Sequence, residues 1–145
     1  MEELKRYLNG LGACDLKDNV DSLESAIRMM FTPQGREFCV KTGFPTLEFL
    51  RKHKEELNAI PGVFIDDGRI TPSFIPDNVT NILISGDTKA YLCVSKPTHL
   101  HKIIVAYNAK LCLSAEVFAV ATITEIGEVH TEIANDGTAK VIIER

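Results

Sequence analysis

Three histidines are the side chains of this sequence best suited to chemistry: His99, His101 and His130. His99 and His101 stand two residues apart, so on a β-strand their imidazole rings would share one face. A ligand from His130 or from Cys93 would then complete a metal site, or one histidine would serve as the general base of an acyltransferase. Surface histidines where a strand begins are the simpler interpretation. We therefore predict neither a metal nor a cofactor, and keep the histidines as candidate catalytic residues.

Aspartates next to glycines form a second group with potential chemistry. Asp66 and Asp67 precede Gly68, and Asp87 follows Gly86. Carboxylates brought together in this way serve as acid and base or as calcium ligands. Aspartate and glycine are also the residues that tight turns prefer, because aspartate bonds to nearby backbone amides and glycine accepts a positive φ. We interpret all three aspartates as turn residues.

The sequence contains none of the common catalytic signatures. It has no G-x-G-x-x-G, G-x-x-x-x-G-K-[ST], H-E-x-x-H or G-x-S-x-G, which are typical of nucleotide-binding proteins, zinc proteases and hydrolases. Enzymatic activity stays open, and the pattern favours a protein that is not an enzyme.

Composition and charge narrow the class of protein. The 145 residues are 45% hydrophobic and 25% charged, as is ordinary for one compact globular unit. No stretch approaches the roughly 18 apolar residues of a membrane span, and Met1–Arg6 leads into an amphipathic pattern rather than a signal peptide. The net charge of −4, without any run of lysine and arginine, argues against nucleic acid. We expect a cytoplasmic protein that binds neither membrane nor nucleic acid.

The four cysteines are far apart and lack the C-x-x-C spacing of zinc sites and redox pairs; they are Cys14, Cys39, Cys93 and Cys112. We expect four reduced, mostly buried thiols. Two disulfides are the alternative, and they would require an oxidising compartment.

The elements that must position these side chains begin with short helices in residues 1–62. An apolar stripe at i, i+3, i+4 and i+7 predicts a first helix that ends near Gly10; its members are Leu4, Tyr7, Leu8 and Leu11. Asp21 is the expected N-cap of a second helix, and Glu24 three residues later completes a capping box.

Two further helices are predicted from proline and glycine. Thr32-Pro33 is typical of a helix start and Gly43 of a helix end, with Phe38 as the expected anchor between them. Pro45-Thr46 opens a fourth helix with a basic outer face, which ends before Pro61-Gly62.

Residues 63–80 are predicted to form a hairpin and a connector. Val63 and Ile65 alternate with their neighbours, and Asp66-Asp67-Gly68 supplies a turn. Pro72 and Pro76 then mark a segment in which a central strand is disfavoured, because proline cannot donate a ladder hydrogen bond.

Residues 81–145 have the pattern of a β-solenoid. Every odd-numbered residue from Ile103 to Ile123 is apolar, a run far too long for one strand. Between Ala109 and Ile123 there is no Gly, Asn, Asp or Pro to make a tight turn. A solenoid can instead bend at small residues without losing its alternation of inner and outer side chains.

Two repeat lengths fit this region. A six-residue register aligns Val105, Leu111, Val117, Ile123 and Val129, and is similar to the hexapeptide repeat of left-handed β-helices. A ten-residue register aligns Ile103, Leu113, Ile123, Ile133 and Ile143, with Gly127 and Gly137 at corners. Both periods are even, so alternation alone leaves both open.

Apolar residues on the outward face and the open end of the solenoid predict association. Cys112, Phe118 and Val120 are the candidate interface residues, unless the helices of the same chain cover them. The last coil also leaves unpaired backbone groups, with Glu144-Arg145 as its only guard. We therefore expect a homo-oligomer or a complex with another protein.

Three segments together resemble uncharacterised proteins of gut Bacteroides-type bacteria: Gly35-Arg36-Glu37-Phe38-Cys39, the stretch from Gly43 to Arg51, and the stretch from Gly62 to Gly68. The resemblance covers most of the chain and implies N-terminal helices, an alanine-rich alternating β tail and a bacterial cytoplasm. It implies no activity.

These observations predict an α+β protein, in which short N-terminal helices precede a short single-stranded, β-helix-like solenoid. The expected parts are residues 1–62, 63–80 and 81–145, in one compact unit. The favoured function is a non-enzymatic protein-binding or assembly module. The alternatives are a small hexapeptide-type acyltransferase using one of the three histidines, and a modulator of a host protein encoded by a mobile element.

Overall fold

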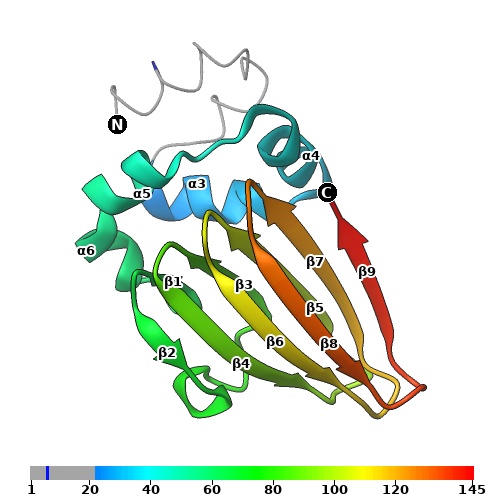
Figure 1. Ribbon diagram of the computed structural model, residues 1–145. Coiled ribbons are helices and arrows are strands. Elements are labelled where there is room, and N and C mark those ends of the chain that lie inside the picture. The colour runs from blue at the N-terminus through cyan, green and yellow to red at the C-terminus, as the bar shows by residue number, and fades with distance from the viewer. Residues whose placement is uncertain (1–5, 7–21) are drawn as a thin grey trace.

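The computed structural model describes Arg6 and residues 22–145 (Figure 1). Its helices are α3 (Leu23–Met30), α4 (Pro33–Thr42), α5 (Leu47–Lys52), α6 (Lys54–Asn58) and the 3₁₀ helix η1 (Pro72–Phe74). Its strands are β1 (Val63–Ile65), β2 (Gly68–Ile70), β3 (Asn81–Ser85), β4 (Thr88–Val94), β5 (Leu100–Ala106), β6 (Lys110–Ala115), β7 (Val120–Ile126), β8 (His130–Asn135) and β9 (Lys140–Glu144). The apolar stripe expected on a first helix lies outside the described residues.

Helix α3 has a different cap from the one expected. Its N-cap is Ser22, whose hydroxyl accepts a hydrogen bond from the Ser25 amide at 3.0 Å, while the Ser25 hydroxyl accepts one from the Ser22 amide at 2.9 Å. The capping box is therefore made by two serines rather than by Asp21 and Glu24. Asp21 itself lies outside the described residues.

Helix α4 confirms the proline and glycine signals. Thr32 caps it, Pro33 is its first residue, and Gly43 ends it in the left-handed region at a φ of 77°. The expected anchor, Phe38, is partly buried and packs against the core, and the neighbouring Cys39 is fully buried.

The fourth predicted helix is two short helices. Thr46 caps α5 as expected, but the backbone at His53, with φ −108° and ψ 20°, leaves the helical region and separates α5 from α6. Arg51 and Lys52 form the exposed basic end of α5.

The second half of the chain is a parallel β-solenoid of about four coils, which confirms the predicted fold class. Each coil contributes one strand to each of two sheets. Sheet A has the order β1-β3-β5-β7-β9 and sheet B the order β2-β4-β6-β8. All neighbouring strands are parallel. Each strand pairs with the one two strands later in the chain, as expected when the chain winds continuously from β1 to β9.

The strand register decides between the two repeat lengths. Ile103, Ile123 and Ile143 stack in sheet A, and Leu113 pairs with Ile133 in sheet B. Successive coils therefore repeat after 20 residues, with a 21-residue step from Leu83 to Ile104. The ten-residue register describes half a coil, that is, one strand and one corner. Three six-residue sides would give a step of 18 residues, which the pairing does not have.

The hairpin expected within residues 63–80 does not form. β1 pairs with β3 and β2 pairs with β4, both in parallel, so Asp66-Asp67-Gly68 is a solenoid corner rather than a hairpin turn. Between β2 and β3 the chain contains the 3₁₀ helix η1, which begins at Pro72, and no strand. The solenoid thus begins at Val63 rather than at residue 81.

Pairs of left-handed residues, not small residues alone, bend the long alternating run. Tyr107 and Asn108 have φ values of 38° and 70°, and Val117 and Phe118 have values of 55° and 57°. Such values are costly for residues with a Cβ, and for Val and Phe above all. Ala109 and Ala119, each just after a bend, are fully buried.

The core has two parts. Inside the solenoid, the two sheets pack their inward side chains against each other, including Ile103, Val105, Leu111 and Ile123. Outside sheet A, the helices cover another set, in which Ile104, Ala106 and Ile126 pack with Met30, Leu50 and Leu57. Figure 1 shows the helices gathered along one side of the stacked strands. None of the described helices combines the length and the apolar composition of a membrane span.

Candidate functional site

The three histidines do not converge. His99 and His101 lie in the corner before β5 and in β5 itself, with ring centroids 6.3 Å apart. Burial, and then the neighbouring His99, lower the pKa of His101 below its ordinary value of 6.5. His130 lies in β8 of the other sheet, where its ring nitrogen Nε2 is 3.0 Å from a Glu132 carboxylate oxygen. The described residues contain no group of three or more His, Cys, Asp or Glu side chains arranged to hold a metal.

The described cysteines are free thiols without the features of a nucleophile. Burial raises the pKa of Cys39 to about 12. Burial also raises the pKa of Cys93 and of Cys112, and a nearby glutamate raises each further. A reactive thiol needs a lowered pKa, so these side chains are poor candidates for covalent catalysis. Cys14 lies outside the described residues.

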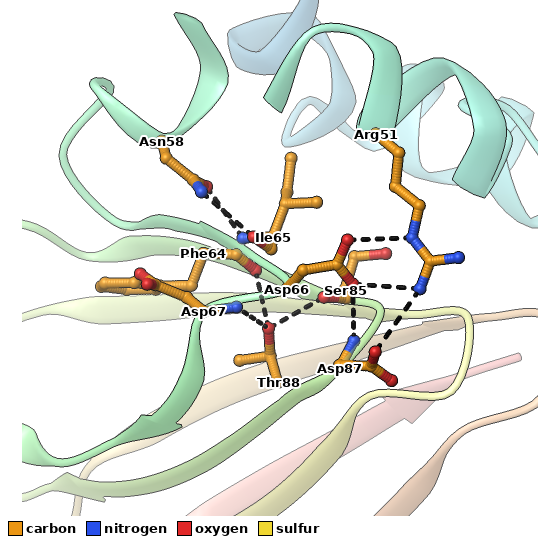
Figure 2. Close-up of polar contacts among 9 residues, drawn as sticks. All are labelled: Arg51, Asn58, Phe64, Ile65, Asp66, Asp67, Ser85, Asp87 and Thr88. Atoms are coloured by element: carbon orange, nitrogen blue, oxygen red, sulfur yellow. Dashed lines mark hydrogen bonds and ion pairs between the residues drawn. The ribbon is translucent and has the colours of Figure 1, made fainter. Parts of the chain in front are cut away.

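The aspartates close the first corner of the solenoid (Figure 2). Asp66 accepts hydrogen bonds from Arg51 through both carboxylate oxygens, at 2.9 and 3.1 Å, and from the Asp87 amide at 2.8 Å. The hydrogen bond from Arg51 is the main reason why the pKa of Asp66 lies below its ordinary value of 3.8. The carboxylate is thus occupied by structural contacts, which agrees with a turn rather than a catalytic pair.

A threonine completes the same corner. The Thr88 hydroxyl donates to the Ser85 carbonyl at 2.9 Å and accepts a hydrogen bond from the Asp67 amide at 3.1 Å (Figure 2). Thr88 is almost fully buried. The Thr88 side chain therefore supplies hydrogen-bond partners for backbone groups at the bend, where strand pairing is interrupted.

An asparagine closes the outer edge of β1. The Asn58 side-chain amide donates to the Ile65 carbonyl at 3.0 Å, and its oxygen accepts from the Ile65 amide at 2.8 Å (Figure 2). Because β1 is the first strand of sheet A, these backbone groups would otherwise have no strand beside them. No sequence pattern near Asn58 indicates this role, because nothing local marks the residue as facing a strand edge.

The last coil has no such closure within the described chain. β9 is the end strand of sheet A, and no described strand pairs with its outer edge (Figure 1). Ile143 is 38% exposed, although Ile123 and Ile103 in the same stack are 0% and 1% exposed. Ile142, on the other face of the strand, is 42% exposed. This open edge is the candidate functional site.

The position of β9 is fixed by side chains at its end. The Glu144 carboxylate accepts hydrogen bonds from Arg36 of α4 at 2.8 Å and from Thr124 of β7 at 2.7 Å. Arg145 donates to Glu125 at 2.7 Å. Polar contacts with helix α4 and with strand β7 therefore hold the end of β9 in place.

The three predicted interface residues lie in three different places. Cys112 is on the outer face of sheet B, Val120 is on the outer face of sheet A, and Phe118 is at the corner between them. Phe118 is 67% exposed and Val117, which the sequence analysis had not selected, is 51% exposed. Asp136 and Thr138 of the next corner accept hydrogen bonds from their two amides, at 3.2 and 2.9 Å. The structure thus brings together Val117 and Phe118, but not Cys112.

Comparison with known proteins gives no further guide: no family model, no curated protein and no solved structure matches this chain. The function has to be inferred from the geometry of the site.

Proposed function

We propose that the protein is a non-enzymatic assembly module that forms a homodimer through its last coil. The observation that carries this proposal is the exposure of Ile143, whose counterparts in the preceding coils are fully buried. Burying an isoleucine side chain stabilises a protein by about 1.5–3 kcal/mol. An exposed edge strand is also a template for pairing with another chain.

The backbone of β9 supports pairing with a second copy. The Lys140 amide donates inward to Ala119 at 2.9 Å, so by alternation the N–H and C=O groups of Val141 and Ile143 are directed to the open edge. In an antiparallel pair centred on Ile142, Val141 of one copy opposes Ile143 of the other. Each such pair exchanges two backbone hydrogen bonds, and a two-fold axis produces two such pairs.

The side chains of β9 are self-complementary in the same register. Lys140 of one copy then opposes Glu144 of the other, and the pairing occurs twice because of the two-fold axis. Opposite charges directly across an antiparallel pair are favourable, whereas like charges are unfavourable. Val141, Ile142 and Ile143 form the apolar centre between the two charged ends.

Light scattering and sedimentation of the intact chain test this proposal. We expect a dimer that dissociates on dilution. Ile143→Pro removes an outward amide and leaves the bonds to β7 in place, so it should abolish the dimer, while Ile143→Ala keeps the amide and should only weaken it. A chain that stays monomeric from micromolar to near-millimolar concentration would rule out the proposal.

A charge reversal tests the register. Lys140→Glu places like charges across both ends of the proposed pair and should weaken the dimer several-fold. Lys52→Glu, at the exposed end of α5, makes the same change in net charge on a different element and should have little effect. Equal effects of the two substitutions would show that β9 does not pair in this register.

The same proposal includes a reducing compartment, which for this chain we take to be the cytoplasm. It is supported by the three described cysteines, which are all free thiols. Alkylation in intact cells, followed by mass spectrometry of Cys93 and Cys112, would test it. These two thiols are not buried, so they should react unless they are disulfide-bonded.

A further inference from the structure

The outer face of sheet B carries a row of basic side chains that is invisible in the linear sequence. Arg69 of β2 pairs with Lys89 of β4, Lys89 with Lys110 of β6, and Lys110 with His130 of β8. All four side chains are exposed. Since neighbouring strands are about 4.8 Å apart, this basic ladder runs about 14 Å across the strands.

The charge of the ladder is only partly compensated by its own sheet. The Arg69 guanidinium and the Lys89 ammonium lie over the ring of Tyr91, at 4.8 and 5.4 Å from its centroid. Glu132, which contacts His130, is the only acidic residue at the outward positions of the described sheet B. Like charges on adjacent strands repel each other, so the ladder favours an acidic partner, although the chain as a whole has a net charge of −4.

A shallow hollow with mostly small side chains lies beside the ladder. Along each strand the next outward residues are Tyr91, Cys112 and Glu132, followed by Cys93, Ser114 and Ala134. The second of these rows has no long side chain. An elongated partner bound along the ladder could place its less polar side against this row of small side chains.

We propose that this face binds an acidic α-helix of a partner protein, with the helix axis along the ladder. A helix repeats every 5.4 Å, so acidic residues on successive turns cover about 16 Å in three steps, close to the 14 Å of the ladder. The difference is within the reach of flexible lysine and arginine side chains. In an extended peptide, side chains on one face are about 6.7 Å apart, and three steps cover about 20 Å, which matches less well.

This proposal is independent of the proposed dimer. The ladder lies on the lateral face of sheet B, whereas the dimer uses the free edge of β9 in sheet A. A substitution in the ladder should therefore leave the oligomeric state unchanged, so the two proposals can fail separately.

The test uses a labelled alanine-based peptide of about fifteen residues with four glutamates on one helical face, and fluorescence anisotropy at low ionic strength. A second peptide has the same composition but distributes its glutamates around the helix. We expect the first peptide to bind the intact chain several-fold more tightly than the second, with an affinity that falls as salt is added.

Variants locate the binding surface. Lys89→Gln/Lys110→Gln should weaken binding of the first peptide roughly tenfold or more, and Lys41→Gln/Lys52→Gln, which removes the same charge from the helices, by less than about twofold. Circular dichroism checks that both variants fold. The proposal is overturned if the two peptides bind equally, or if both double variants lose affinity equally. It is also overturned if a single-stranded oligonucleotide or an acidic polysaccharide binds through Lys89 and Lys110 more tightly than the peptide does.

Discussion

The first and last coils of the solenoid are built from the same repeat, but they are finished differently. In the first coil, Asn58 satisfies the free backbone groups of Ile65, and Arg51 ties the corner at Asp66 to helix α5. In the last coil, the edge of β9 is bare and Ile143 is partly exposed. The difference teaches that side chains of the helical segment satisfy the free backbone groups at the β1 edge of sheet A, whereas no described strand covers the β9 edge of the same sheet.

The largest expected effect comes from removing one isoleucine at each end. Ile65→Ala deletes a fully buried side chain and should lower the free energy of unfolding by about 2–5 kcal/mol. Ile143→Ala should cost clearly less, because Ile143 is 38% exposed. Urea denaturation at a concentration where the chain is monomeric measures both values. If the two substitutions cost the same, the two ends do not differ as the structure indicates.

A pair of glycines provides the next comparison. A Cβ at Gly86 would lie 2.1 Å from a carboxylate oxygen of Asp66, whereas a Cβ at Gly137 meets nothing within 4 Å. Both residues have a positive φ, so each alanine costs about 1–2 kcal/mol from the backbone. Gly86→Ala should cost more, because it also displaces Asp66 from Arg51. Thermal unfolding of the two variants tests the order.

Removing the closure of β1 should have a somewhat smaller effect. Asn58→Ala leaves the Ile65 amide and carbonyl without their partner and should cost about 1–3 kcal/mol. Asn58→Asp retains the acceptor but places a carboxylate oxygen against the Ile65 carbonyl oxygen, so it should cost at least as much as alanine. Hydrogen exchange should show faster exchange of the Ile65 amide in Asn58→Ala; unchanged protection would contradict the closing role.

The smallest effect is expected from pH. The folded protein lowers the pKa of Asp66 below 3.8, mainly through the hydrogen bond from Arg51. Protons therefore bind the unfolded state first, so this carboxylate stabilises the fold above its unfolded pKa and loses that contribution as pH falls through the folded pKa. Asp66→Asn should unfold with a weaker dependence on pH below about 4. Parallel stability curves for the two proteins in that range would show that Asp66 is not the group responsible.

Local sequence rules predicted most of the elements but not how they join. Pro33 and Gly43 were sufficient for α4, because proline at the first turn and glycine after the last act within a few residues. Asp66-Asp67-Gly68 predicts a hairpin turn by local rules, and the same residues also suit a solenoid corner. Only the distant partners of β1 and β2 separate the two cases.

The candidate sites were less predictable than the fold. The open end was expected from Ile143 and Glu144, because a strand after the Asn135-Asp136-Gly137 turn could be identified locally. Val117 was missed, since its odd position suggested an inward side chain, whereas a left-handed backbone turns it outward. The closure by Asn58 was missed because its partner strand is set by tertiary packing.

The sequence by itself determined that residues from Ile103 onwards have an inner and an outer face, because alternation depends only on the geometry of a strand. It also determined the helix starts and the absence of known catalytic motifs. Only the tertiary structure decided which residues stack on one another. Successive members of the basic ladder are 20 or 21 residues apart in the sequence: Arg69, Lys89, Lys110 and His130. They form one row because this spacing equals the length of one coil, so each residue pairs with the next on the neighbouring strand.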